Sequence, residues 1–146
     1  MAQIETFTAR QTLKVCQGFQ GEARIEGFPP LAFDEPADLG GTNTAPAPID
    51  YLLTAVGGCL LSSLSFCVQK KRVQAAIAAD VSGRVERDAD GLLRVQQIDV
   101  ELRVSAAEAD WKKVEGCHDI FKKYCIVSAS VARGIPIETR LHLSAP

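Results

Sequence analysis

The sequence has few of the residues from which metal sites and hydrolytic triads are built. It contains only two histidines, His118 and His142, and it has no Cys-x-x-Cys, His-Glu-x-x-His, phosphate-loop or dinucleotide-binding motif. Cys117, His118 and Cys125 do not have zinc-ligand spacing, because adjacent helical residues point about 100° apart and the third lies two turns away. The sequence therefore predicts no metal site and no cofactor.

A strong excess of one charge is also missing. There are 16 Lys and Arg residues against 18 Asp and Glu, and the formal net charge is -2. Without a broad basic face, nucleic acid is not expected as a partner. The first residues lack the basic and apolar regions of a signal peptide, so a reducing cytoplasm is the expected location. An odd number of cysteines, five, is compatible with free thiols there and does not indicate a disulfide scaffold.

One long stretch, residues 51–69, contains no charged side chain. Its length approaches that of a membrane-spanning helix. Small and polar residues dilute its hydrophobicity, among them Thr54, Ser62 and Ser65. We therefore interpret it as the buried helix of a soluble protein and expect no membrane partner.

The first third of the chain predicts strands and a loop. Residues 4–33 have short apolar groups separated by glycines and by Pro29-Pro30, which is typical of strands and turns. Residues 34–48 are rich in proline, and loops of this length in compact domains are often functional.

The rest of the chain predicts alternating helices and strands. Residues 49–72 form a long helix that ends in basic residues, and 75–104 form a hairpin around the turn at 88–91. Ser105 and Glu108 have capping-box spacing, so a second, amphipathic helix is expected over 105–125. A short helical stretch over 126–133 and a last strand over 135–143 follow. The fold class is α+β, with one domain over residues 1–146.

Cysteine is the remaining candidate reagent. Cys16, Cys67 and Cys117 are most simply small core residues. Cys59 follows Gly57-Gly58 inside the long helix, where each glycine costs about 1 kcal/mol relative to alanine. A glycine pair there indicates that another backbone or a substrate approaches closely, or that two helices pack there.

A Cys-His hydrolase is an open alternative. Within one helix His118 cannot pair with Cys117 or Cys125, so this function requires a tertiary contact that brings His118 to a cysteine such as Cys59.

Several short motifs, in this order and at these spacings, resemble the OsmC/Ohr family of osmotically inducible and organic hydroperoxide resistance proteins, over residues 21–143. The matching residues are Asp34-Glu35-Pro36, Gly40-Gly41, Pro46-x-Pro48-x-Asp50-Tyr51-Leu52-Leu53-x-Ala55-x-Gly57-Gly58-Cys59 and Cys125-x-Val127-Ser128.

The resemblance implies an intertwined homodimer with two antiparallel β-sheets around long central helices and active sites at the subunit interface. It also implies a thiol-dependent peroxidase for organic hydroperoxides. Cys59 would attack the peroxide and Cys125 would resolve the product as a Cys59–Cys125 disulfide. An external dithiol, either a lipoyl protein or a thioredoxin-like protein, would reduce that disulfide.

The resemblance further implies how the Cys59 thiolate forms. In the family an arginine from the N-terminal strands, held by an acidic residue ahead of the cysteine, supplies the positive charge. These residues correspond here to Arg24 and Asp50. Arg10 has similar surroundings and is an alternative to Arg24, and Asp50 is also a candidate helix N-cap.

One position departs from the organic hydroperoxide branch of the family. In that branch a glutamate stands where this chain has Ile49, and here the acidic residue comes one position later, as in the broader OsmC-like branch. The difference motivates a second hypothesis, a stress-related ligand-binding dimer of the same fold with little or no turnover.

Overall fold

The computed structural model describes residues 7–13 and 18–146. The chain divides into two compact units, Met1–Leu52 and Leu53–Pro146, and the boundary between them falls inside the long helix α1 (Pro48–Lys70). Helices and strands are mixed along the chain, so the predicted α+β class is confirmed.

The N-terminal unit contains a three-stranded antiparallel sheet with the order β1-β2-β3. Its strands are β1 (Arg10–Leu13), β2 (Gly21–Arg24) and β3 (Leu31–Phe33). The strand-and-turn prediction for residues 4–33 is confirmed where the structure describes them, over residues 7–13 and 18–33. The proline-rich loop that follows contains one short 3-10 helix, Ala37–Leu39. Cys16 lies outside the described residues.

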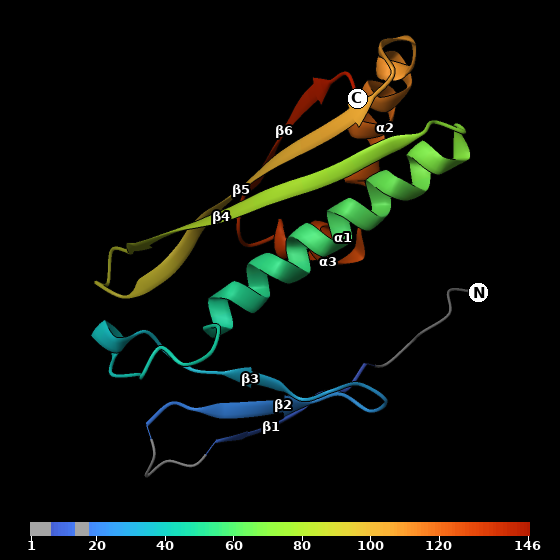
Figure 1. Ribbon diagram of the computed structural model, residues 1–146. Coiled ribbons are helices and arrows are strands. Elements are labelled where there is room, and N and C mark those ends of the chain that lie inside the picture. Colours follow the sequence, from blue (N-terminus) through green and yellow to red (C-terminus); the bar gives the residue numbers. More distant parts are fainter. Residues whose placement is uncertain (1–6, 14–17) are drawn as a thin grey trace, which may run out of the picture. The chain divides into compact units, whose positions relative to one another are not determined.

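The C-terminal unit is built on the predicted hairpin, which forms two long strands (Figure 1). β4 (Ala75–Arg87) and β5 (Leu93–Ala106) pair in antiparallel register. The Asp88 carboxylate closes the turn by accepting hydrogen bonds from the backbone N–H groups of Asp90 and Leu92 at 3.0 and 2.9 Å. Gly91 takes the left-handed conformation that the turn needs, with φ +79°.

The third strand of this sheet, β6 (Ile137–Ser144), pairs with β5 in parallel. The sheet is therefore mixed, and the expectation of two purely antiparallel sheets was wrong for this edge. The reason is the connection from β5 to β6, which passes through two helices. Such a crossover returns the chain to the same end of the sheet, as parallel pairing requires.

α1 lies along one face of this sheet, and the core lies between them (Figure 1). One stripe of the helix is buried, at the spacing of one helical face, and its apolar members are Val56, Leu60, Leu64 and Val68. Alternate residues of β5 are buried against it, namely Ile98, Val100, Leu102 and Val104.

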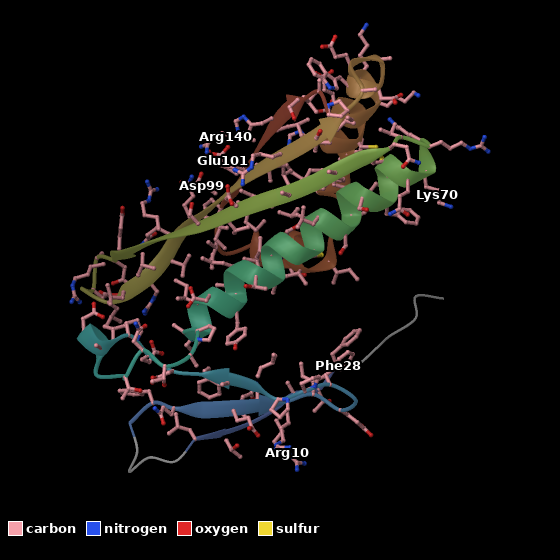
Figure 2. The ribbon with its side chains drawn as sticks, viewed as in Figure 1. Arg10, Phe28, Lys70, Asp99, Glu101 and Arg140 are labelled. Carbon is pink, nitrogen blue, oxygen red and sulfur yellow. A yellow bond between two sulfur atoms is a disulfide. The ribbon has the colours of Figure 1, made fainter. Side chains whose placement is uncertain are left out.

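Charged residues of β5 and β6 alternate with these core positions. The Arg140 guanidinium donates hydrogen bonds to Glu101 at 2.5 Å and to Asp99 at 3.3 Å. Figure 2 shows the three side chains on the side of the sheet away from α1. The sheet therefore has one apolar face and one polar face.

Two helices complete the core, α2 (Trp111–Phe121) and α3 (Ile126–Val131). The predicted helix start at Ser105 was wrong, because β5 continues to Ala106 and keeps Ser105 in the strand. Because Ser105 pairs with both β4 and β6, the hydrogen-bonding groups of its backbone are satisfied within the sheet. A short 3-10 helix, Glu108–Asp110, then leads into α2.

By length and composition, α1 is apolar enough to cross a membrane. Its mean hydropathy over the best window is 1.8, and 28% of that window is buried inside the structure. The core stripe described above accounts for the apolar residues on one side of the helix. The side of α1 that faces away from the sheet keeps exposed apolar residues, and Phe66 is 64% exposed.

Candidate active site

Cys59 and Cys125 are joined by a disulfide, with Cα atoms 5.8 Å apart, although they are 66 residues apart in the sequence. Cys59 lies on α1 beside the buried Leu60 and is itself half-buried, whereas Cys125 is almost completely buried. The fold therefore brings together the two cysteines that the motifs singled out, and it leaves the α1 cysteine nearer to the surface.

Cys125 occupies the N-cap of α3, not the end of the helix before it. α2 ends at Phe121, where the backbone N–H groups of Lys123 and Tyr124 close the last turn. The Cys125 sulfur then accepts a hydrogen bond from the backbone N–H of Ser128, at 3.3 Å. This donor would favour the thiolate form of Cys125 when the disulfide is reduced, because a hydrogen bond to a charged form stabilises it.

Cys67 and Cys117 form a second disulfide, with Cα atoms 5.7 Å apart. The sequence interpretation placed both as simple core residues and missed this bond. A signal was present. Cys67 follows Cys59 by eight residues, and Cys117 precedes Cys125 by eight. Equal intervals of this kind are expected when two antiparallel segments are joined by two disulfides.

Arg24 and Asp50 belong to the N-terminal unit, whereas Cys59 and Cys125 belong to the C-terminal unit. Arg24 lies on β2 and is exposed, and its Nε contacts the Glu22 carboxylate at 2.7 Å. Arg10 of β1 stands directly opposite Arg24 in the strand register. Residues opposed in this way point to the same face of a sheet, so the two candidate arginines present their charges on one side.

Asp50 lies in the first turn of α1, and its carboxylate accepts a hydrogen bond from the backbone N–H of Ala47 at 2.8 Å. It therefore caps the helix from inside the first turn, as the third helical residue does in a capping box. Its proposed role in holding an arginine stays a prediction, as does the activating role of Arg24 or Arg10.

The loop before α1 is organised by Asp34, a residue whose role the sequence did not reveal. Its carboxylate is completely buried and accepts hydrogen bonds from the backbone and hydroxyl groups of Thr42 and Thr44 and from the backbone N–H of Glu35. The Thr42 hydroxyl bond, at 2.6 Å, is the largest of the effects that hold the pKa of Asp34 far below its usual value, against the opposing effect of burial.

Gly41 is required in the same loop, because an added Cβ would collide with the backbone of Glu35. The Asp34-Glu35-Pro36 and Gly40-Gly41 motifs thus describe one folded loop ahead of α1.

His118 is half-buried on α2, and its Nε2 is 3.2 Å from the Thr139 hydroxyl. Burial, together with the nearby positive charge of Lys122, lowers the pKa of His118 below its usual value. The histidine therefore has a hydroxyl partner in place of a thiol, and this arrangement does not favour a Cys-His hydrolase.

A small cavity of about 80 Å³ is lined by Leu60, which follows Cys59 on α1, by Ser128 and Ala132 of the α3 region, and by Thr139 of β6, among others. Among residues 7–13 and 18–146, no group of three His, Cys, Asp or Glu side chains is placed to hold a metal ion.

A family described as OsmC-like protein matches residues 41–140 of the chain. This span includes α1, the hairpin and both disulfides. No functionally curated protein matches the sequence.

Solved structures share the fold over nearly the whole chain. An OsmC-like protein of unknown function from Vibrio cholerae has a TM-score of 0.83 at 13% identity, covering 95% of this chain and 100% of its own. An organic hydroperoxide resistance protein OsmC from Legionella pneumophila has a TM-score of 0.70 at 16% identity, covering 98% and 99%. One from Elizabethkingia anophelis has a TM-score of 0.68 at 18% identity and covers both chains completely.

Proposed function

Since this chain belongs to the OsmC-like protein family, we propose that it is a thiol-dependent peroxidase that reduces organic hydroperoxides. Cys59 is the attacking thiol and Cys125 the resolving thiol. The observation that carries the proposal is the Cys59–Cys125 disulfide, which joins two distant parts of the sequence.

The chemistry needs no cofactor, because two thiols supply both electrons. The Cys59 thiolate attacks one peroxide oxygen, the O–O bond breaks, and the departing alkoxide takes a proton to leave as an alcohol. Cys59 is then a sulfenic acid. The Cys125 thiol condenses with it, so that an S–S bond forms and water leaves. An external dithiol, from a lipoyl protein or a thioredoxin-like protein, reduces the disulfide to two thiols.

The assignment of roles follows from burial. Cys59 is half-buried and Cys125 is 1% exposed, so a peroxide reaches Cys59 more easily. The Ser128 N–H that contacts the Cys125 sulfur stabilises this sulfur as the leaving thiolate when the disulfide is reduced.

The Cys59 thiolate also needs a positive charge. Cys59 lies well beyond the first turn of α1. The helix dipole has little effect on a side chain that far from the start of the helix. We assign the charge to Arg24, with Arg10 as its neighbour on the same face of the N-terminal sheet and Asp50 as the carboxylate that positions it.

We also propose that the protein acts as a cytoplasmic homodimer. The support is the N-terminal unit, whose apolar residues Leu13, Phe28 and Leu31 stay exposed in a single chain. A second copy of the chain would cover such a surface.

The proposal is tested by mixing the reduced protein with one equivalent of cumene hydroperoxide in a stopped-flow instrument. We expect Cys59 to be oxidised far faster than Cys16, and peptide mapping to recover a Cys59–Cys125 disulfide. In a Cys67→Ser/Cys117→Ser background, which leaves only this pair and Cys16, adding Cys59→Ser should remove the fast phase, whereas adding Cys16→Ser should keep it. Equal oxidation rates for Cys59 and Cys16 would reject the proposal.

The second candidate, a ligand-binding dimer without useful turnover, is favoured by Ile49, which replaces the glutamate of the organic hydroperoxide branch. The same peptide map separates the two functions. Random or absent oxidation of Cys59 supports ligand binding, and a stoichiometric Cys59–Cys125 disulfide supports catalysis.

A further inference from the structure

An apolar groove of about 520 Å³ lies beside the second disulfide, between α1 and the end of α2. Its walls are mostly apolar and carry one lysine, which Figure 2 labels near the C-terminal end of α1. The lining residues are Ser62, Ser63, Phe66, Cys67, Lys70, Ile120, Phe121 and Tyr124.

The two cysteines of this disulfide differ in access. Cys67 is half-buried and lines the groove, whereas Cys117 is completely buried in the core. The first pair has the same asymmetry, with a half-buried Cys59 on α1 and a buried Cys125. In both pairs a half-buried cysteine on the long helix is therefore bonded to a buried cysteine from the C-terminal helices.

From this repeated arrangement we infer that Cys67 and Cys117 are a second redox-active pair, in which Cys67 reduces apolar organic hydroperoxides that enter the groove and Cys117 resolves the product. The inference goes beyond the proposed function of Cys59 and Cys125 and does not depend on it.

The reaction balances with hydroperoxide as the oxidant. The Cys67 thiolate forms an S–O bond as the O–O bond of the hydroperoxide breaks, and the alkoxide takes a proton and leaves as an alcohol. The Cys117 thiol then attacks the Cys67 sulfenic acid, an S–S bond forms, and water leaves. A dithiol reductant returns both sulfurs to thiols with two electrons.

The groove supplies the apolar surface and the positive charge that this reaction needs. Phe66, Ile120 and Tyr124 are each at least 40% exposed and offer apolar surface to the organic part of a hydroperoxide. The Lys70 ammonium lies 5.3 Å from the centre of the Phe66 ring and brings a positive charge to the wall that contains Cys67. Positive charge near a cysteine favours its thiolate.

The two pairs are separate centres. Cys59 and Cys67 are eight residues apart on α1, which corresponds to a rise of about 12 Å, too far for a thiol at one position to attack the disulfide at the other. Within one chain, the second pair is therefore not oxidised by exchange with the first.

The decisive variant carries Cys16→Ser, Cys59→Ser and Cys125→Ser, so that Cys67 and Cys117 are its only thiols. After reduction and removal of the reductant, it is mixed with one equivalent of cumene hydroperoxide or of hydrogen peroxide. We expect a stoichiometric Cys67–Cys117 disulfide by peptide mapping. Cumene hydroperoxide should react at least about tenfold faster than hydrogen peroxide, because only the former buries apolar surface in the groove.

Three further variants in this background assign the roles of the two thiols and of the groove. Adding Cys67→Ser should abolish the fast reaction. Adding Cys117→Ser should leave Cys67 reactive but stop it at the sulfenic acid, which dimedone traps. Ile120→Ser should slow cumene hydroperoxide and leave the rate with hydrogen peroxide unchanged.

The inference is overturned if Cys67 and Cys117 remain thiols after cumene hydroperoxide is added, or if Cys67→Ser leaves the rate of peroxide loss unchanged.

Circular dichroism of the reduced variants checks that they fold. If the triple variant does not fold, the order of thiol loss in the reduced wild-type protein, trapped with maleimide at successive times, answers the same question. A Cys67→Ser/Cys117→Ser variant tests Cys59 and Cys125 by themselves, so the failure of one pair is distinguishable from failure of the other.

Discussion

Gly57 and Gly58 are neighbours on α1, but only one of them is closely packed. A Cβ built on Gly57 would lie 2.7 Å from a methyl carbon of Val81 on β4, closer than real Cβ contacts. A Cβ on Gly58 would have no atom within 4 Å in the described part of the chain. The close approach that the glycine pair indicated is therefore the approach of β4 to the helix at Gly57.

This difference predicts opposite effects for two identical substitutions. Gly57→Ala should destabilise the protein by about 1–3 kcal/mol, because the stiff, branched Val81 side chain must move. Gly58→Ala should stabilise it by about 0.5–1 kcal/mol, because alanine is the better helix former. Urea unfolding of the two variants and the wild type measures both. A loss of stability in Gly58→Ala would contradict the prediction and would indicate that another surface covers this position.

Asp34 makes the stability of the loop before α1 depend on pH. Because the folded state lowers the pKa of this carboxyl, the ionised form stabilises the fold above the ordinary aspartate pKa of about 4. This contribution is lost as the pH falls through the lowered value in the folded protein. An asparagine cannot replace the carboxylate, because its NH₂ group would face N–H and O–H donors.

We therefore expect Asp34→Asn to lower the melting temperature at neutral pH, and the difference from wild type to shrink as the pH falls below about 4. Thermal unfolding across this range measures the effect. Asp38→Asn is the matched control, since it removes an exposed carboxylate from the same loop. A gap between Asp34→Asn and wild type that stays constant with pH would rule out the ionised carboxylate as its source.

At the scale of elements, the sequence predicted best where local chemistry decides the structure. The hairpin was predicted because residues 88–91 specify a turn and the flanking residues alternate. The long helix was predicted because residues 49–72 contain no proline and end in positive charge.

Elements set by distant contacts were predicted less well. The end of β5 at Ala106 is fixed by pairing with both β4 and β6, which overrides the local capping-box spacing at Ser105. The parallel direction of β6 depends on the whole crossover through α2 and α3. The Cys67–Cys117 bond joins residues 50 positions apart, and only the matched intervals between the cysteines indicated it.

At the scale of the whole molecule, the two disulfides are nested and both connect α1 to the C-terminal helices. The outer bond, Cys59–Cys125, encloses the inner bond, Cys67–Cys117, in the sequence. Each bond restricts the unfolded chain, and by loop-closure entropy a single loop of 50 or 66 residues corresponds to about 4 kcal/mol. When the inner bond is present, the loop that the outer bond closes is much shorter.

We therefore expect the oxidised protein to be more stable than the reduced protein, with a second bond that adds less than the first. Against a first contribution of about 4 kcal/mol, the outer bond should add about 3 kcal/mol once the inner bond has formed. Urea unfolding of the oxidised wild type, the reduced wild type, Cys59→Ser/Cys125→Ser and Cys67→Ser/Cys117→Ser separates these terms, with Cys16→Ser as the control for loss of one thiol. Equal free energies of unfolding for the oxidised and reduced forms would contradict the prediction. The unfolded state of the reduced chain would then already be restricted, and the two pairs would serve chemistry without stabilising the fold.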